Sequence, residues 1–269
     1  MTVGATVLFS GTGLAQAAPS GSASHPVSVA KASAKVDKGK VDKAKAGKAK
    51  ADKAKADKAK AAAEAKALVK DKAAALKAAA QVEKDLGRVT AALSKATNLT
   101  EAHRSTLVAA QAAVQADIST ARQRIEAATT RAAVSAQSAA LRTLRNHVHG
   151  VGRAVQVVDK ADAAVVEAAQ AHAELLAAVE QAQAQGKDLT ALTEEIDAAA
   201  PALADATAAL NAAADLLANN ARTATGHTVS KVSQSRDALE LVETGIDELT
   251  AQVLALLDPQ MPEEKVGEV

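Results

Sequence analysis

The sequence predicts an all-α fold: an elongated antiparallel helical bundle or coiled coil with a Lys-rich N-terminal arm. Alanine, the strongest helix former, accounts for 73 of the 269 residues. Leu, Ile, Val and Phe together number only 55, and the chain has no Cys, Trp or Tyr. Apolar residues recur at threes and fours from about residue 61 onward. So few large apolar side chains exclude a thick globular core and an aromatic-lined ligand pocket.

The two ends of the chain differ from the helical middle. Residues 1–17 are mostly apolar and end in Ala15-Gln16-Ala17, which is typical of a signal peptide, although no Lys or Arg precedes the apolar stretch. Residues 18–35 are predicted to be a flexible linker, and the acidic residues 258–269 a disordered tail. No later run reaches the roughly 18 apolar residues of a membrane span. The sequence therefore predicts a secreted or cell-envelope-associated protein without a transmembrane span, and the lack of cysteine excludes a disulfide framework.

Charge divides the chain into two opposite regions. Residues 31–95 carry 19 Lys and Arg against 8 Asp and Glu, whereas residues 96–269 carry 13 against 23. Within the basic region, residues 36–60 form five successive five-residue units rich in Lys, Ala and Asp. A five-residue period turns each unit by about 140° around a helix, so the lysines surround it and leave no face to bury. This cationic arm is predicted to be either a solvated single helix or a disordered segment.

The lysines of the arm are the candidate binding residues. Dense lysine without aromatic neighbours attracts phosphate, sulfate or carboxylate polymers, and it has no groups that read base sequence. The expected partners are anionic polymers such as wall polymers, glycosaminoglycans or DNA, bound without sequence specificity. A solvated spacer would have the same charge. The predicted polyanion-binding residues are Lys38, Lys40, Lys43, Lys45, Lys48, Lys50, Lys53, Lys55, Lys58 and Lys60.

Residues 61–257 are predicted to form the bundle, which also offers helix–helix surfaces for self-association. The first helix should end near Ala96, and the second should cover about 99–128 with either Asn98 or Thr100 as its N-cap. The third should span 131–185 after a turn at 129–130. Its two interior glycines predict a bend or a close helix contact there. These are Gly150 and Gly152.

The last two helices follow a short turn. Gly186 should end the third helix and Asp188 should cap the fourth. Pro201 should kink or restart the fourth helix near Asp197. Thr228 should cap the fifth. The fourth helix has a large apolar residue at every seventh position, at Leu189, Ile196, Leu203, Leu210 and Leu217.

Side chains suited to catalysis or metal binding are few. No histidine has Asp or Glu three or four residues away, so no helix presents a Glu-x-x-His metal pair. His147 and His149 lie about 200° apart around a helix and cannot face one ion. Asp162 and His172 fall on otherwise apolar heptad positions, which favours a role in fixing helix register. Asp159 and Asp162 form a lone Asp-x-x-Asp, for which surface charge is the simpler interpretation.

The sequence therefore predicts a non-enzymatic protein with no catalytic residue, metal site or cofactor. A helical enzyme or metal carrier is the alternative, in which His147, His149 or His172 would act.

Several segments resemble known proteins. Leu99-Thr100-Glu101-Ala102, the ADI at 116–118 and the LRNHVHGVGRAVQVVDKAD at 144–162 resemble a type of secreted actinobacterial helical-bundle protein, over about residues 99–257. The lysine–alanine units resemble the sugar-binding tail of mycobacterial heparin-binding haemagglutinin, which implies polyanion adhesion. Their composition is also similar to the envelope-spanning helix of TolA-like proteins, which implies a spacer.

Taken with the charge pattern, these resemblances favour an exported, non-enzymatic interaction protein whose cationic arm binds surface polyanions. The alternative is a purely structural coiled-coil spacer or oligomer.

Overall fold

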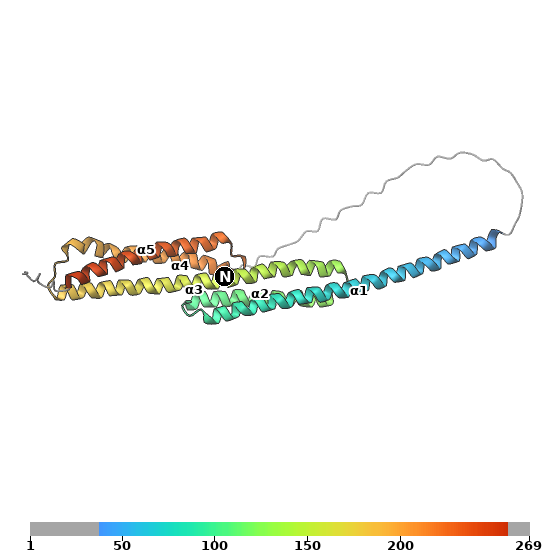
Figure 1. Ribbon diagram of the computed structural model, residues 1–269, viewed down its shortest axis with the longest axis horizontal. Coiled ribbons are helices and arrows are strands. Elements are labelled where there is room, and N and C mark those ends of the chain that lie inside the picture. Colours follow the sequence, from blue (N-terminus) through green and yellow to red (C-terminus); the bar gives the residue numbers. More distant parts are fainter. Residues whose placement is uncertain (1–37, 258–269) are drawn as a thin grey trace, which may run out of the picture. The chain divides into compact units, whose positions relative to one another are not determined.

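The computed structural model describes residues 38–257, and over this range it contains five α-helices, two short 3-10 helices and no strand. The all-α helical bundle is thus confirmed. The predicted signal peptide, linker and acidic tail lie outside the described residues, as do positions 36 and 37 of the arm. The elements are α1 (Lys38–Lys95), α2 (Glu101–Ala127), α3 (Arg131–Ala184), η1 (Thr190–Leu192), α4 (Thr193–Asn219), η2 (Ala221–Thr223) and α5 (Gly226–Leu257) (Figure 1).

Helix α1 includes the lysine units and the first predicted helix of the bundle as one continuous element. Of the two alternatives for residues 38–60, the structure shows the helix. The chain divides into two units within α1, after Asp57. The description of packing that follows concerns the second unit, from Lys58 to Leu257.

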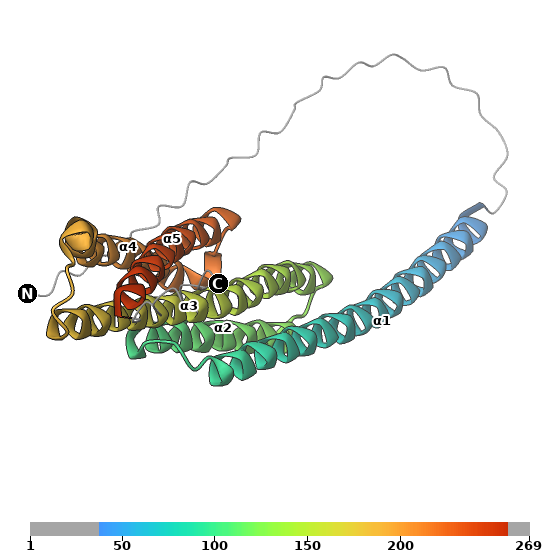
Figure 2. The same ribbon diagram turned by 60° about the vertical axis from the view of Figure 1, so that its left-hand side comes forward.

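Two three-helix bundles share α3. The C-terminal part of α1, with α2 and the first part of α3, forms one bundle; the rest of α3, with α4 and α5, forms the other (Figures 1 and 2). Helices α1 and α3 run parallel, because Asp71 pairs with Arg131 at 2.7 Å and Asp85 lies 3.3 Å from Arg145, each pair 60 residues apart. Helix α2 runs antiparallel to both.

Apolar residues that recur every seven positions are buried or partly buried. Along α3, Val134, Leu141, Val148 and Val155 form such a series and are all at most 2% exposed. In α4, Leu210 and Leu217 are fully buried, whereas the earlier heptad positions are only partly buried. Many of the remaining core positions are alanine, which lets helix backbones approach closely. The core is therefore thin, as the composition predicts.

Three of the predicted helix boundaries are confirmed in detail. Thr100 is the N-cap of α2, where its hydroxyl accepts a hydrogen bond from the backbone N–H of His103 at 3.3 Å. Thr130 caps α3 in the same way through Ala133. Gly186 ends the turn after α3 with a φ of 71°, a left-handed conformation that favours glycine.

Three other boundary predictions are corrected. Asp188 accepts hydrogen bonds from the N–H and hydroxyl of Thr190, the first residue of the 3-10 turn η1. Helix α4 begins only at Thr193, so Asp188 is not its cap. Of the two alternatives at Pro201, a kink or a restart of the helix, the restart near Asp197 is wrong. Helix α4 begins at Thr193 and continues through Pro201, which is exposed and leaves its lost hydrogen bond to solvent.

The third correction concerns the start of α5. The cap there is Thr225, because its hydroxyl accepts from the N–H of Thr228 at 3.3 Å. The Thr228 hydroxyl in turn accepts from the N–H of Thr225 at 3.1 Å. This reciprocal pair is a capping box with threonine in the place of the usual Glu or Gln. Thr228 is thus the third residue of the helix, where it supports the cap.

Candidate functional site

All ten candidate lysines lie on α1. The side chains of Lys48, Lys50, Lys53, Lys55, Lys58 and Lys60 are exposed; those of Lys38, Lys40, Lys43 and Lys45 lie outside the described side chains. Every residue from Lys50 to Lys66 is exposed, on all sides of the helix. The pentapeptide period therefore gives the expected result, a helix that presents lysine in every direction and buries none of its faces.

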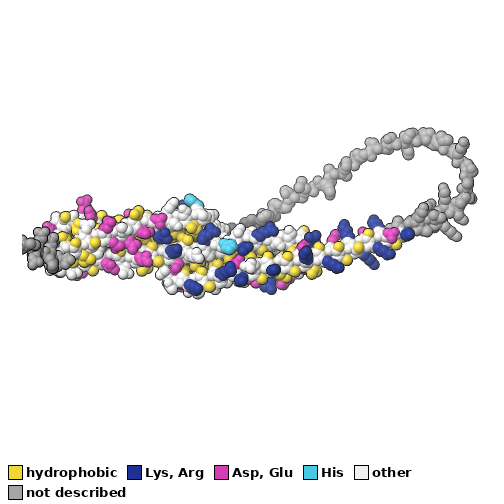
Figure 3. All heavy atoms as spheres, in the orientation of Figure 1, with side chains coloured by type: hydrophobic (Ala, Val, Ile, Leu, Met, Phe, Trp, Pro, Cys, Tyr) yellow, Lys and Arg dark blue, Asp and Glu magenta, His cyan; other side chains and the backbone are white. Residues whose placement is uncertain are grey.

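Charge is unevenly distributed in the bundle as well. On the face in Figure 3, Lys and Arg gather over α1 and the first bundle, and Asp and Glu gather over the second. The acidic side chains include Glu167 on α3 with Glu240, Glu243 and Asp247 on α5, which line one shallow depression. The structure thus retains, as separate surfaces, the two charge regions seen in the sequence.

A buried ionic cluster lies where the two bundles meet. His103, 6% exposed, places Nδ1 2.9 Å from both carboxylate oxygens of Asp162, which is 2% exposed. Its Nε2 lies 3.0 Å from Oδ1 of Asp215. Ionised carboxylates only accept hydrogen bonds, so the ring satisfies both partners when both of its nitrogens carry hydrogen. The cluster joins α2, α3 and α4.

Asp162, together with Asp159, also holds the start of α2. Asp162 Oδ2 accepts from the backbone N–H of Thr100 at 2.7 Å, and Asp159 Oδ1 accepts from that of Asn98 at 3.0 Å. Negative charge is favourable there because a helix N-terminus has unpaired N–H groups and a positive dipole end. Asp159 and Asp162 therefore do not form the free pair of carboxylates that acid–base catalysis needs, and both bind the α1–α2 turn.

The other histidines are not brought together. His147 is partly buried on α3, where burial and then the nearby Arg222 lower its pKa, while Asp117 acts in the opposite direction. Its Nδ1 is buried and has no hydrogen-bond partner among the described residues. His149 is exposed and His172 is half-buried further along α3. Within residues 38–257, no group of three or more His, Asp or Glu side chains could hold a metal ion.

Gly150 provides a close contact of the kind that the sequence predicted. A Cβ at this position would lie 2.5 Å from the carbonyl oxygen of Ala221 and 3.1 Å from that of Arg222. The backbone of η2 therefore packs directly on α3. Arg222 also forms an ion pair with Asp117 of α2, which fixes η2 at the junction of the two bundles.

Glu243 allows a test of the acidic surface. Burial raises the pKa of Glu243, and the carboxylates of Glu167, Asp247 and Glu240 raise it further. The Glu243 carboxyl group therefore stays protonated to a higher pH in the folded protein than in the unfolded chain. Its ionisation destabilises the fold as pH rises. We expect Glu243→Gln to raise the free energy of unfolding at pH 7 by about 0.5 kcal/mol.

Urea unfolding between pH 4 and 8 measures this effect. The gain should shrink toward pH 4.5, the ordinary pKa of glutamate, because the native side chain is then largely protonated. Glu248→Gln, on an exposed position of the same helix, is the control and should change stability little. A gain in unfolding free energy that is the same at every pH would contradict a raised pKa of Glu243.

His103 and Asp215 were not predicted from the sequence. A metal pair on one helix needs an acidic residue within one turn of the histidine, whereas Asp162 is 59 residues from His103 and Asp215 is 112 residues away. A clue was present, because His103 precedes Leu107 by one turn on the apolar stripe of α2. A polar residue at that position requires a polar partner in the core.

Fold and surfaces together define a class: an all-α protein of two three-helix bundles with an exposed cationic helix. None of the described helices is long and apolar enough to span a membrane. Comparison of the chain with protein-family models, with curated proteins and with solved structures gave no match.

Proposed function

We propose that this chain is an exported, non-enzymatic interaction protein of the cell envelope or extracellular space. In this proposal residues 38–60 of α1, which we call the lysine helix, bind surface polyanions. The observation that carries the proposal is the exposure of lysine on every side of α1 between Lys48 and Lys60. Lysine side chains on a helix that buries no face serve no packing role there. They attract anionic polymers through release of counterions.

The charge density suits a polymeric partner. Residues 38–60 contain ten Lys and three Asp, a net charge of +7. As a helix they extend over about 35 Å, which places one net positive charge roughly every 5 Å. The exposed lysines from Lys48 to Lys60 point in all directions. Such a helix suits a flexible polyanion that wraps around it better than it suits a flat anionic surface. Lysine is a point charge with rotatable donors, and it needs no fixed geometry in its partner.

A structural spacer is the second candidate. It is favoured by the continuity of α1, which runs for 58 residues without a break. Charge would then serve only to keep the helix solvated. The two candidates differ in one respect: a spacer is indifferent to polyanions.

Substitution of three lysines tests the proposal. Lys50, Lys53 and Lys55→Gln in the full chain should weaken heparin binding at least about tenfold at 0.1 M salt. The slope of log affinity against log salt should fall by roughly one per lysine that contacts the polymer. Gln is a good helix former, so α1 should remain helical.

A matched variant provides the control for net charge. Lys160, Lys187 and Lys231→Gln removes the same charge elsewhere and should change affinity less than about twofold. Equal losses in the two variants would show that only net charge matters. Binding that neither variant changes would leave the spacer as the better interpretation.

A further inference from the structure

A groove lies between α1 and α3. It runs along the parallel pair from Asp71 and Arg131 to Ala92 and Gln156, in two successive sections of about 700 and 610 Å³. We call it the α1–α3 groove. The first section is lined by α1 and α3 alone, and the second also by Ala224, from the connection between η2 and α5.

The cations of the α1–α3 groove differ from those of the lysine helix. Apart from one histidine, every basic residue that lines the groove is arginine. Arginine presents a planar fork of donors that binds one sulfate, phosphate or carboxylate group through two parallel hydrogen bonds, which lysine does not. Five arginines against two aspartates give the lining a net charge of +3. The residues are Arg88, Arg131, Arg142, Arg145 and Arg153, with Asp71 and Asp85.

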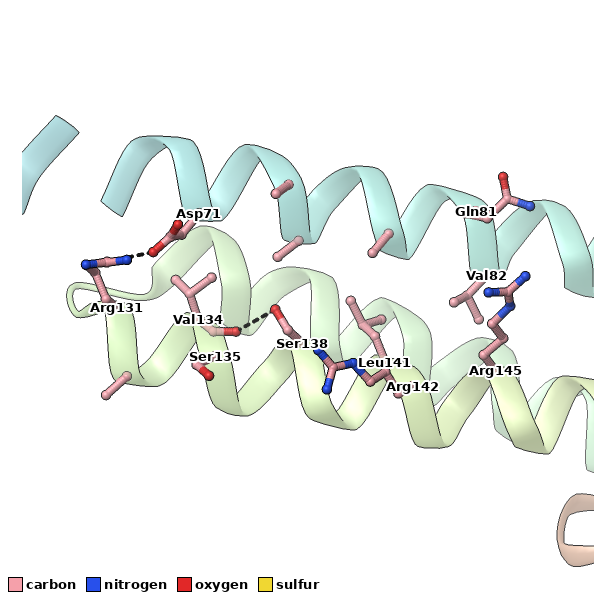
Figure 4. Close-up of a pocket in the computed structure, with 14 residues that line it drawn as sticks. Asp71, Gln81, Val82, Arg131, Val134, Ser135, Ser138, Leu141, Arg142 and Arg145 are labelled. Atoms are coloured by element: carbon pink, nitrogen blue, oxygen red, sulfur yellow. Dashed lines mark hydrogen bonds and ion pairs between the residues drawn. The ribbon is translucent and has the colours of Figure 1, made fainter. Parts of the chain in front are cut away.

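The arginines of α3 form a ladder. Arg142, Arg145, His149 and Arg153 follow one another at steps of three, four and four residues, so they share one face of the helix. Neighbouring steps rise about 4.5–6 Å along the axis. Figure 4 shows Arg145 extending from α3 toward α1, whereas Arg142 lies along α3. The ladder matches a linear chain that carries an anionic group at similar intervals.

A buried carboxylate positions two of these arginines. Asp85, 5% exposed, accepts from Arg88 Nη1 at 3.0 Å through Oδ1, and its Oδ2 lies 3.3 Å from Arg145 Nε. Gln81 donates to the same carboxylate at 3.0 Å. Both guanidinium groups remain more than half exposed, so their other N–H groups face solvent. The two ion pairs restrict the orientation of these groups before any ligand binds, which reduces the entropy cost of binding.

The floor of the α1–α3 groove narrows the class of ligand. It is formed by small and apolar side chains, among them Ala74, Ala78 and Val134. Such a floor favours a ligand with apolar faces, as sugar rings have, because their contact removes apolar surface from water. A single-stranded nucleic acid would find no aromatic ring for its bases, since the only aromatic residue of the chain is Phe9.

We infer that the α1–α3 groove is an oriented binding site for a sulfated linear polysaccharide, with sulfates on the arginine forks and sugar rings on the alanine floor. The inference deepens the proposed function, on which it rests for the class of ligand. The lysine helix attracts the polysaccharide without a fixed geometry of contact, and the α1–α3 groove fixes how the polysaccharide is oriented.

The test is heparin binding by full-length variants, measured by calorimetry. Arg142 and Arg153→Gln should weaken binding roughly tenfold or more. Arg142 and Arg153→Lys keeps the charge but loses the forks, and should still weaken binding about threefold. Arg124 and Arg236→Gln, on α2 and α5, removes the same charge outside the groove and should have less than a twofold effect.

The outcomes separate this inference from the proposed function. If the Gln pair binds as the control does while the lysine triple variant fails, the groove is not a site and the lysine helix stands alone. If the groove variants fail while the lysine triple variant binds normally, the groove stands and the lysine helix proposal fails. Full binding by the Lys pair overturns the oriented contact. Stronger groove-dependent binding of polyphosphate or single-stranded DNA than of heparin overturns the polysaccharide.

Discussion

Replacing Asp162 with alanine should lower the free energy of unfolding by about 3–5 kcal/mol. The carboxylate has two partners that would remain buried without it, the His103 ring and the backbone N–H of Thr100. Loss of one member of a buried pair leaves the other uncompensated, and this costs more than the lost hydrogen bonds alone. The change should be measured by urea denaturation at pH 7, followed by circular dichroism.

Asp215→Ala is the matched comparison. This carboxylate contacts the other nitrogen of the same ring at 3.0 Å, but its side chain is 64% exposed. Water can replace it, so the loss should be less than about 1 kcal/mol. Asp162→Asn should fall between the two because the amide oxygen can still accept one hydrogen bond. Equal effects of Asp162→Ala and Asp215→Ala would contradict the central place of Asp162 in the cluster.

The helices could be predicted from the sequence because each has its own apolar period. Leu107, Val114, Ile118 and Ile125 of α2 follow one another at spacings of seven, four and seven residues, and all four are fully buried. A stripe of this kind depends only on residues within the same helix, and it is therefore readable without knowing the neighbours. The turn at Thr130 was predictable for the same reason.

The features that depend on two helices were predictable only in part. Asp162 was recognisable as a polar residue on an apolar position, but its partners come from distant segments. The arginine ladder of α3 was not recognised as a surface, because it becomes a groove only when α1 lies parallel to it with a 60-residue offset. Thr225 was missed as a cap because Thr228, at the third position of α5, has equal capping propensity.

Gly150→Ala should lower the free energy of unfolding by about 2–3 kcal/mol, even though alanine normally stabilises a helix interior. The new Cβ would lie 2.5 Å from the carbonyl oxygen of Ala221, closer than real contacts allow. Because the obstacle is backbone, the 3-10 turn η2 would have to move away from α3. Thermal and urea unfolding of the variant measure the cost.

The other helical glycines allow a graded comparison. At Gly87 and Gly245 a Cβ would meet nothing within 4 Å, so alanine there should stabilise by about 0.5–1 kcal/mol. At Gly152 it would lie 3.2 Å from a methyl group of Val89, a side chain that can shift, so the effect should be intermediate. If Gly150→Ala were as stabilising as Gly87→Ala, η2 would not be held against α3. The contact at Gly150 would then not be what holds η2, the connection between α4 and α5, against α3.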